Sequence, residues 1–304
     1  MTMNNINSIV DLAVQKGCEV KRNVNLKEIT SIRTGGPVNS IIIPKSSAAA
    51  AAVLKESQKR CVKVTLLGNG SNVLAPDEGL DGIILRTAGG LNELYLQDEI
   101  TIYCGSGVAL TRLCMFAYEN SLTGLEFAYG IPGTAGGAAY MNAGAYGGEM
   151  KDIVLFCSHI DNDFNENKLF ASELDFSYRS SAYMKNGFTI TGISVRLKKG
   201  NKTEIKAKMD ELMGKRHTKQ PLDYPSAGSV FMRPQNNFAG ALIERCGLKG
   251  YSVGGAQVSE KHAGFIINTG NATTSDVLKL IEFIQKKVWE KTGVSLKTEV
   301  KILR

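Results

Sequence analysis

The sequence is poor in the side chains that bind metal ions. It contains three histidines and six cysteines among 304 residues, and the cysteines lie far apart, without the close spacing of paired zinc ligands. A zinc site is therefore not expected. Several cysteines, such as Cys104, have apolar neighbours, which indicates buried free thiols in a reducing cytosol.

The sequence also lacks a long apolar run. No stretch approaches the ~20 residues that cross a bilayer, and the N-terminus has no basic segment followed by the apolar core of a signal peptide. We expect a cytoplasmic protein without membrane insertion. Because no exposed apolar stripe stands out, we also expect a monomer.

No basic segment is interleaved with aromatic residues, so nucleic acid is not expected as a partner. The net charge is nevertheless +7. Two interpretations stay open: a solvated basic surface, or the attraction of ligands that carry phosphate. The densest basic stretch, residues 198–208, resembles a turn followed by the solvated face of a helix.

What the sequence does contain is a regular succession of helix and strand patterns. The first ~87 residues alternate strands with an Ala-rich helix that Ser46 or Ser47 can cap, which is typical of an α/β unit, and the remainder looks α+β. Ser275 is a candidate cap of a long helix that Gly293 ends. The apolar spacing further predicts helices at 5–16, 110–118, 203–216 and 238–246, a hairpin within 91–105, and strands at 38–43, 63–67, 83–85, 153–160, 188–197 and 296–303.

Glycine is abundant, with 32 residues, and it concentrates between residues 68 and 147. The first loop, residues 67–74, reads LGNGSNVL and follows a predicted strand. The second, residues 130–137, reads GIPGTAGG. Small residues let successive backbone N–H groups face one concavity, which binds anions. Residues 33–36 (RTGG) can add a cation, so the three segments indicate a cofactor that carries phosphate.

The alternative is that both loops are ordinary tight turns. The first has Val73 where a Rossmann pattern needs glycine, and neither loop continues into the Gly-Lys-Ser/Thr of a P-loop. The local pattern therefore leaves the identity of the ligand open.

Motifs along nearly the whole chain resemble those of the UDP-N-acetylenolpyruvoylglucosamine reductases, the MurB family, within the FAD-binding fold shared with vanillyl-alcohol oxidase. The resemblance includes residues 33–36, both glycine loops and Glu299. The further matching segments are 126–130 (EFAYG), 142–147 (NAGAYG), 178–181 (YRSS), 219–222 (KQPL), 227–231 (AGSVF), 239–243 (AGALI) and 258–265 (VSEKHAGF).

The resemblance implies an FAD-dependent oxidoreductase, a flavoprotein of peptidoglycan synthesis. In this family NADPH reduces a non-covalently bound FAD, which passes a hydride to the vinyl carbon of UDP-N-acetylglucosamine enolpyruvate and yields UDP-N-acetylmuramate. Cell-wall biogenesis, cell shape, cell cycle and cell division are the processes implied. The short spacing between Arg179 and Arg216 resembles the shorter, type II-like form, which has no substrate-covering tyrosine in this region.

The implied fold class is α+β, with an α/β first unit. It comprises a two-part FAD-binding fold of the PCMH/VAO type and a C-terminal α+β domain for the substrate. The expected segments are residues 1–87 and 88–202 for FAD, and 203–304 for the UDP-sugar. Residues 297–304 are a candidate return of the chain to the active site.

Three residues match the family's catalytic positions: Ser229, Arg179 and Glu299. Hydride addition pushes negative charge into the substrate carboxylate, which the fork of Arg179 can stabilise. Ser229 would then act as general acid toward carbon, with Lys219 able to offset the charge of the alkoxide. Glu299 lies opposite the apolar positions of the last predicted strand. It either polarises the carboxylate or orients a proton, and both roles stay open.

Each catalytic candidate also has an ordinary interpretation: a surface ion pair for Arg179, a turn serine for Ser229 and a solvated strand carboxylate for Glu299. His262 can equally be a structural histidine, and Arg233 departs from relatives with an uncharged polar residue there. The resemblance assigns FAD to Arg33, Thr34, Gly35, Gly68, Asn69, Gly70, Ser71, Asn72, Gly130, Ile131, Pro132, Gly133, Thr134, Gly137, Asn142 and Gly144. It assigns the substrate to Tyr178, Arg216, Lys219, Arg233, Lys261 and His262.

Two other functions are compatible with parts of the sequence. Another FAD-dependent oxidase or dehydrogenase of the same fold is the first, but such oxidases often bind FAD covalently through His or Cys, and neither glycine loop contains one. A non-catalytic nucleotide-binding module is the second. The joint presence of all three catalytic candidates argues against it.

Overall fold

A computed structural model describes residues 3–304 and divides the chain into two compact units. Unit 1 comprises Met1–Arg22, Asn39–Asn69 and Gly82–Gly214, and unit 2 comprises Asn23–Val38, Gly70–Asp81 and Lys215–Arg304. One boundary, between Asn69 and Gly70, falls inside the first glycine loop. Among the described residues, no helix is at once long and apolar enough to cross a membrane.

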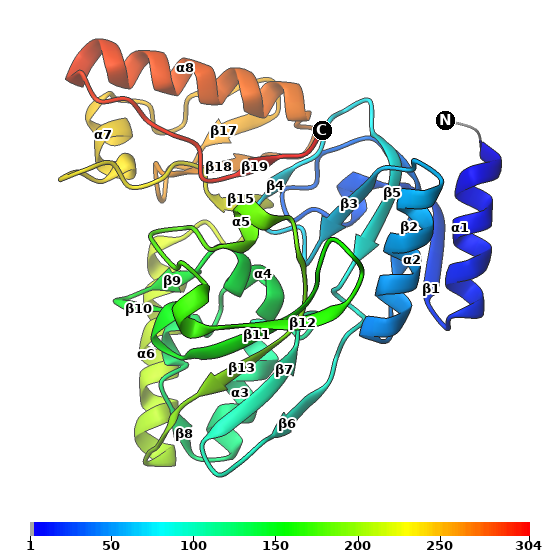
Figure 1. The fold of residues 1–304 in the computed structure, drawn as a ribbon. Coiled ribbons are helices and arrows are strands. Elements are labelled where there is room, and N and C mark those ends of the chain that lie inside the picture. Colours follow the sequence, from blue (N-terminus) through cyan, green and yellow to red (C-terminus); the bar gives the residue numbers. More distant parts are fainter. Residues whose placement is uncertain (1–2) are drawn as a thin grey trace. The chain divides into compact units, whose positions relative to one another are not determined.

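The predicted α/β pattern forms a four-stranded sheet (Figure 1). The strand order is β1-β2-β5-β3, and β3 runs parallel to β5 with Leu67 opposite Arg86. In unit 1, helices α1 and α2 share a buried core with this sheet. The elements are α1 (Met3–Gln15), β1 (Glu19–Asn25), β2 (Pro37–Ile43), α2 (Ser47–Lys59), β3 (Val64–Leu67) and β5 (Leu80–Arg86).

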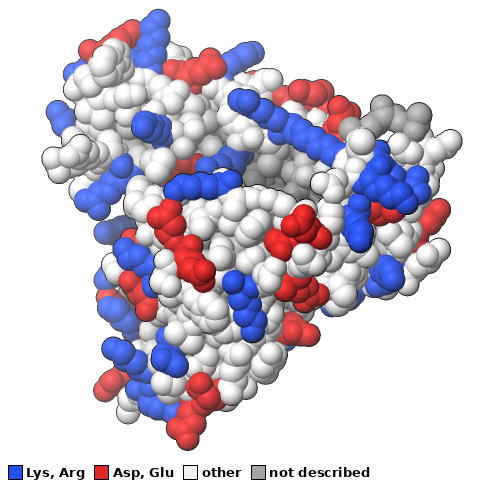
Figure 2. All heavy atoms as spheres, viewed as in Figure 1, with Lys and Arg blue, Asp and Glu red and all other residues white. Residues whose placement is uncertain are grey.

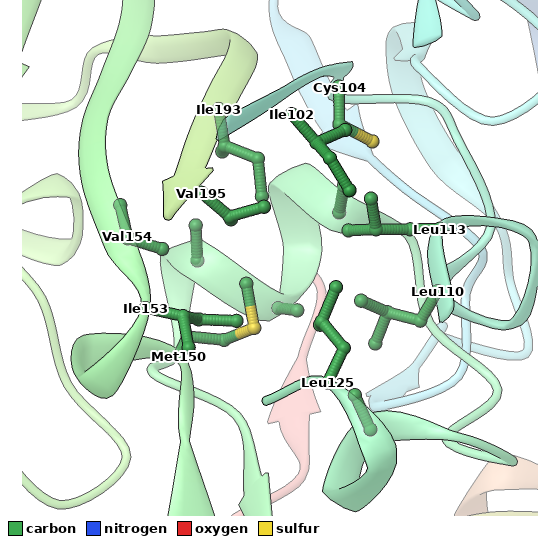
Figure 3. Close-up of a cluster of buried hydrophobic side chains, with 14 of the residues drawn as sticks. Ile102, Cys104, Leu110, Leu113, Leu125, Met150, Ile153, Val154, Ile193 and Val195 are labelled. Carbon is green, nitrogen blue, oxygen red and sulfur yellow. The ribbon is translucent and has the colours of Figure 1, made fainter. Parts of the chain in front are cut away.

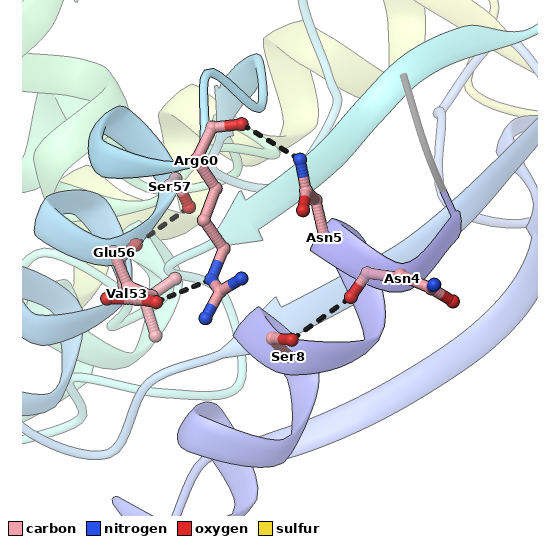
Figure 4. Close-up of polar contacts among 7 residues, drawn as sticks. All are labelled: Asn4, Asn5, Ser8, Val53, Glu56, Ser57 and Arg60. Carbon is pink, nitrogen blue, oxygen red and sulfur yellow. Dashed lines mark hydrogen bonds and ion pairs between the residues drawn. The ribbon is translucent and has the colours of Figure 1, made fainter.

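Helix α2 begins where the sequence predicts, because the Ser46 hydroxyl accepts a hydrogen bond from the backbone N–H of Ala49. Polar contacts join its end to α1: the Asn5 side chain donates to the carbonyl of Arg60 at 3.3 Å, and Arg60 is paired with Glu56 (Figure 4). These contacts fix the two helices against each other.

The larger sheet of unit 1 has five strands in the order β12-β11-β13-β7-β6, all antiparallel to their neighbours. Buried side chains such as Ile102 and Ile193 of this sheet pack with Leu113 of α3 and with Met150 (Figure 3). The elements are β6 (Leu94–Leu96), β7 (Thr101–Gly105), α3 (Leu110–Glu119), β11 (Val154–Ile160), β12 (Glu166–Phe170) and β13 (Thr189–Arg196).

Short elements connect these strands and surround the second glycine loop. They include two small two-stranded sheets, β9 with β10 and β8 with β14. The remaining elements are β8 (Leu122–Thr123), η2 (Glu126–Ala128), α4 (Ala135–Tyr140), β9 (Gly144–Ala145), β10 (Gly148–Glu149), η3 (Met150–Asp152), η4 (Ala171–Glu173), α5 (Tyr183–Asn186), β14 (Lys198–Lys199) and α6 (Lys202–Lys219), which runs from unit 1 into unit 2.

Unit 2 contains a four-stranded sheet in the order β15-β18-β17-β16. Leu242 of α7, Ile281 of α8 and Ile266 of β18 share its buried core. A short parallel pair, β4 with β19, joins the C-terminal strand to the segment after the first glycine loop. The elements are η1 (Leu26–Glu28), β4 (Val73–Leu74), β15 (Ser226–Ser229), α7 (Ala239–Arg245), β16 (Ser252–Val253), β17 (Ala256–Val258), β18 (Phe265–Asn268), α8 (Thr274–Thr292) and β19 (Lys301–Ile302).

The structure confirms the predicted helices and corrects two details of the third segment. The cap of α8 is Thr273 and not Ser275, because Thr273 and Asp276 form a reciprocal capping box that starts the helix earlier. The last strand is also shorter than residues 296–303. Its ordered pairing is confined to β19, while Thr298 makes one isolated bridge to Phe231.

Charged side chains are spread over the surface. On the face in Figure 2, Lys and Arg lie among acidic and uncharged side chains and form no continuous basic field. The basic stretch at residues 198–208 confirms the predicted helix, which is the start of α6, but Lys198 and Lys199 form strand β14 instead of the predicted turn, because they pair with β8. Lys206 pairs with Asp210 on that helix.

Candidate active site

The two glycine loops meet within unit 1. Gly68 follows β3, and a Cβ placed on it would lie 2.8 Å from the hydroxyl oxygen of Thr134 in the second loop. The side chain of Asn69 donates to the carbonyl of Pro132 at 2.9 Å. The Thr134 hydroxyl accepts from the backbone N–H of Gly137 at 3.2 Å and so begins α4. The structure therefore brings together two segments that the sequence could only propose separately.

The first loop offers donors that the protein itself does not use. Within residues 3–304, the backbone N–H groups of Asn69, Gly70 and Ser71 find no acceptor. Successive backbone N–H groups without partners bind anions, and the small residues leave room for a phosphate to approach. This loop therefore fits the diphosphate of a dinucleotide cofactor.

In unit 2, residues 29–36 pack against the second half of the same loop. The N–H of Ser31 donates to the carbonyl of Gly70 at 3.0 Å, and its hydroxyl donates to the carbonyl of Ser226 at 2.6 Å. Gly70 has φ +66°, and a Cβ there would lie 2.4 Å from the carbonyl oxygen of Ile29. Only glycine satisfies both conditions.

Two of the predicted cofactor residues in this segment have structural partners. The Thr34 side chain is buried, and its hydroxyl accepts a hydrogen bond from Thr274 at 2.7 Å. Arg33 adopts φ +58°, and the side chain of Asn268 donates to the carbonyls of Ile32 and Arg33. Arg33, Thr34 and Gly35 are thus held in a fixed turn by the sheet of unit 2 and the start of α8.

Ser229 lies at the end of β15, after a bulge. Ser226 pairs with Ile267 and Ser229 with Phe265, so one extra residue is accommodated between them, where Gly228 has φ +76°. Bulges of this kind redirect a side chain out of the regular alternation. The half-buried Ser229 hydroxyl makes a long contact of 3.4 Å with the carbonyl of Phe231.

Glu299 lies beside the serine strand in unit 2. Its backbone N–H donates to the carbonyl of Val230 at 2.7 Å. On its other side, the Asn72 side chain donates to the Glu299 carbonyl at 3.4 Å, and the N–H of Lys301 donates to the carbonyl of Asn72 at 3.0 Å. The segment with Glu299 therefore lies between the serine strand and the end of the first glycine loop.

His262 belongs to the same neighbourhood. Its Nδ1 accepts from the N–H of Gly264 at 3.1 Å, and a Cβ on Gly264 would lie 3.5 Å from the Ser229 hydroxyl. Because Nδ1 accepts, the ring proton of neutral His262 is on Nε2. Burial lowers the pKa of His262, which favours this neutral form.

Arg179 lies in unit 1 at a tight turn. Ser177 and Ser180 exchange two backbone hydrogen bonds of 3.1 Å, which leaves Tyr178 and Arg179 at the tip. Arg179 has φ +56°, a conformation that costs a non-glycine residue free energy. Its guanidinium donates to the carbonyl of Gly144 at 3.2 Å and lies 5.3 Å from the centre of the Tyr178 ring.

Asn142 supports this turn from beneath. It is fully buried, and its amide donates to Glu149 at 2.8 Å and to the carbonyl of Ser177 at 3.0 Å. Burial opposes ionisation of Glu149, but hydrogen bonds from Lys151 and Asn142 hold the pKa of that carboxyl below its usual range. The predicted cofactor residue Asn142 therefore links the Gly144 segment to the arginine turn.

The predicted substrate cations are all in unit 2, and three of them lie on or contact the C-terminal end of α6. Arg216 and Lys219 lie on the last turns of α6, and the ammonium of Lys261 donates to the carbonyl of His217 there at 2.6 Å. The guanidinium of Arg233 lies 4.0 Å from the centre of the exposed Phe238 ring. Arg216 is buried, whereas Lys219 and Lys261 are exposed and are of the kind that suits a diphosphate.

The catalytic candidates are therefore divided between the units. Ser229 and Glu299 share unit 2, whereas Arg179 and Tyr178 belong to unit 1. Sequence reasoning overlooked Arg86, at the end of β5, whose guanidinium donates to the carbonyl of Gly68 at 3.4 Å. Its position as the last residue of a parallel strand beside a glycine loop was the available signal.

Two models of known protein families match parts of this chain. Residues 220–303 match the model described as UDP-N-acetylenolpyruvoylglucosamine reductase, C-terminal domain. Residues 38–163 match the model described as FAD binding domain.

Individual proteins are similar along almost the full length. The UDP-N-acetylenolpyruvoylglucosamine reductase of Clostridium novyi is 45% identical over 285 residues, 94% of this chain and 92% of that protein. The reductase of Thermotoga maritima is 49% identical over 277 residues, 90% of this chain and 95% of that protein. The crystal structure of the enzyme from Thermus caldophilus superposes with a TM-score of 0.81 at 33% identity, covering 94% of this chain and all of that one.

Proposed function

The chain belongs to the UDP-N-acetylenolpyruvoylglucosamine reductase family and reduces UDP-N-acetylglucosamine enolpyruvate to UDP-N-acetylmuramate, and we propose that Ser229, Arg179 and Glu299 perform this chemistry. The reaction belongs to peptidoglycan synthesis, with NADPH as the reductant. NADPH provides a hydride, which FAD, when bound, supplies to the vinyl carbon of the substrate. The fold is the α+β FAD-binding type with a C-terminal substrate domain.

Arg179 is the proposed partner of the substrate carboxylate. As hydride reaches the vinyl carbon, the electron pair of the double bond moves toward the carboxylate. A fixed guanidinium stabilises that charge because its position needs no rearrangement during the reaction. The turn between Ser177 and Ser180 and the bond to Gly144 support this role, since the turn holds the backbone of the arginine and the bond holds its guanidinium.

Ser229 is the proposed proton donor to the carbon that bears the carboxylate. The hydroxyl proton goes to carbon, and the alkoxide regains a proton from solvent. Lys219 is the proposed source of compensating positive charge. The single observation that supports the assignment most is the backbone bond of 2.7 Å between Glu299 and Val230, because it fixes a carboxylate next to the serine strand. Glu299 would orient the donated proton.

The remaining assignments are proposed on the same basis. The glycine loops, with Arg33, Thr34, Asn142 and Gly144, hold FAD non-covalently. Arg216, Lys219 and Lys261 bind the diphosphate of the substrate, with Tyr178, Arg233 and His262 as further contacts. Residues 1–87 and 88–202 serve FAD, and residues 203–304 serve the UDP-sugar. The enzyme is proposed to act as a monomer in the cytoplasm.

An anaerobic titration of the purified yellow protein tests this function. NADPH is expected to bleach the flavin absorbance, and UDP-N-acetylglucosamine enolpyruvate is expected to restore it stoichiometrically. The matched control is UDP-N-acetylglucosamine, which lacks the vinyl group and should leave the flavin reduced. A flavin that only oxygen reoxidises would contradict the proposal. Flavin that stays attached in denaturant would instead favour an oxidase with a covalent cofactor.

A further inference from the structure

Arg86 stands at the carboxyl end of two parallel strands of unit 1. It is the last residue of β5, it pairs with Leu67 at the end of β3, and Gly68 follows directly. Ligands of sheets with parallel strands bind beyond the carboxyl ends of those strands. The side chain is half-buried, and its Nε donates to the carbonyl of Gly68 at 3.4 Å.

The charge of Arg86 has no counterion of its own in the described chain. No carboxylate among residues 3–304 lies within 4 Å of the guanidinium. The acidic group that affects it electrostatically is Glu19, which is paired with Lys21 and Lys45. Burial lowers the pKa of Arg86, and Glu19 opposes this only in part. The protein therefore keeps a half-buried cation at a cost in stability.

The terminal nitrogens of Arg86 also have no acceptor among residues 3–304. The neighbouring loop shows the same property, because the N–H of Asn69 is without an acceptor too. Hydrogen-bond donors of a guanidinium and of the adjacent backbone that have no acceptor are suited to a ligand rich in oxygen atoms and negative charge. A diphosphate provides acceptor oxygens on two phosphorus atoms and can satisfy both.

We infer that Arg86 is a phosphate-binding residue of the dinucleotide cofactor site, where it supplies the positive charge that the first glycine loop lacks. The inference deepens the proposed function, because it rests on the binding of FAD by this loop. A purely structural arginine would not produce the following pair of effects. Removing the cation should weaken FAD binding and yet relieve the apoprotein of an uncompensated buried charge.

The experiment compares the apoprotein of the wild type with Arg86→Met and Arg86→Lys. FAD affinity is measured from the quenching of flavin fluorescence, and the thermal midpoint is measured without FAD. For Arg86→Met we expect the Kd to rise about 10- to 100-fold, as for the loss of a charged hydrogen bond. The midpoint of the apoprotein should stay the same or rise. Arg86→Lys should give an intermediate Kd because it keeps the charge and loses the fork.

Arg60→Met is the matched control, since Arg60 also belongs to unit 1 but is paired with Glu56. It should leave the Kd for FAD unchanged and lower the midpoint slightly. An unchanged Kd in Arg86→Met overturns the inference. A weaker Kd together with a lower apoprotein midpoint also overturns it, because that result shows a structural arginine. If the wild-type apoprotein does not bind FAD, the cofactor assignment itself fails, which the wild-type titration reveals separately.

Discussion

The two units hold their catalytic candidates in different ways. In unit 2, Ser229 and Glu299 lie on neighbouring segments that exchange backbone hydrogen bonds, and the serine segment also pairs with β18. In unit 1, Arg179 stands at the tip of a turn and adopts φ +56°, and its guanidinium donates a hydrogen bond to the carbonyl of Gly144. The serine and the glutamate are fixed by pairing, whereas the arginine is fixed by a strained turn.

This difference suits the roles proposed for the two groups. A proton donor must lie at one distance from one carbon, and paired strands fix such a distance well. Arginine has a long side chain, so its backbone can lie at a distance from the substrate while its guanidinium points toward the carboxylate. In the proposed role, the strain at Arg179 is the cost of directing its guanidinium, and residues in such conformations often cluster at functional sites.

The largest effect should come from removing Ser229, the proposed proton donor in unit 2. In Ser229→Ala, the rate at which substrate reoxidises the reduced flavin should fall about 10²- to 10⁴-fold, the range of general acid catalysis. Reduction by NADPH should stay near the wild-type rate, because that half-reaction needs no proton from the serine. Stopped-flow absorbance measures both steps. Equal losses in both would show that the serine acts on the flavin site and not on the substrate.

A somewhat smaller effect is expected at the turn of unit 1. Arg179→Ala and Arg179→Gly should both slow reoxidation by substrate about 10²- to 10³-fold, as for the loss of a charge-stabilising donor. The two variants should differ in stability. Glycine accepts φ +56° without strain, so Arg179→Gly should be more stable than Arg179→Ala by about 1 kcal/mol. Urea unfolding measures this difference.

The two Arg179 variants also test whether the two units hold their catalytic candidates in different ways. If Arg179→Gly retains rapid reoxidation, the arginine has no role in catalysis. If the alanine variant is the more stable one, the turn does not store strain, and the contrast with the paired strands of unit 2 disappears.

A coupled effect of about 10-fold is expected between the cofactor loop and the glutamate of unit 2. The Asn72 side chain donates to the carbonyl of Glu299 at 3.4 Å, and Lys301 donates to the carbonyl of Asn72. Asn72→Ala should therefore slow reoxidation in the wild type by displacing Glu299, as for one lost hydrogen bond. In a Glu299→Gln background the same change should have little further effect, since the carboxylate it positions is already absent.

The test measures the rate of reoxidation by substrate at saturating FAD in the wild type, in the two single variants and in the double variant. Additive losses would contradict a positioning role for Asn72, because independent residues do not influence each other's effect. Weaker FAD binding alone, with normal reoxidation at saturation, would assign Asn72 to the cofactor only.

The local sequence was sufficient for elements with strong caps or apolar periods. Helix α2 begins at the predicted serine, and α8 ends at Gly293, which adopts the left-handed conformation of a C-cap. Strands β1 and β12 were not predicted. Both lie at the edge of a sheet and have mostly exposed or half-buried residues, so they lack the alternation that marks a strand with one buried face.

The chemical identity of the site could be predicted further than its geometry. Each glycine loop is recognisable by itself, because its residues are adjacent in the sequence. The contact between Asn69 and Pro132 joins residues 63 positions apart, and no local pattern reports such a distance. The last segment is similar. Leu296 and Val300 are buried, which confirms the predicted alternation, but the alternation did not indicate how far this segment pairs with the serine strand.

The smallest expected effect compares two histidines, His159 of unit 1 and His262 of unit 2, which differ in burial. His159 of unit 1 is 2% exposed, and its Nδ1 lies 3.0 Å from the hydroxyl of Tyr183. Burial lowers the pKa of His159 and of His262 in unit 2. A lowered pKa means that below about pH 6.5 the unfolded chain takes up a proton that the folded chain refuses. Stability is therefore complete above that pH and falls as the pH drops toward the folded pKa.

The slope contributed by one such histidine is at most about 1.4 kcal/mol per pH unit. His159→Phe should reduce the loss of stability between about pH 6.5 and 5, although it also removes the contact with Tyr183. His262→Gln should reduce it less, because His262 is only half-buried and so sheds less solvent on folding. Urea unfolding of the FAD-saturated protein, followed by circular dichroism across this range, measures both slopes. If His159→Phe keeps the wild-type slope, acid sensitivity arises elsewhere, and burial in unit 1 does not distinguish its histidine from that of unit 2.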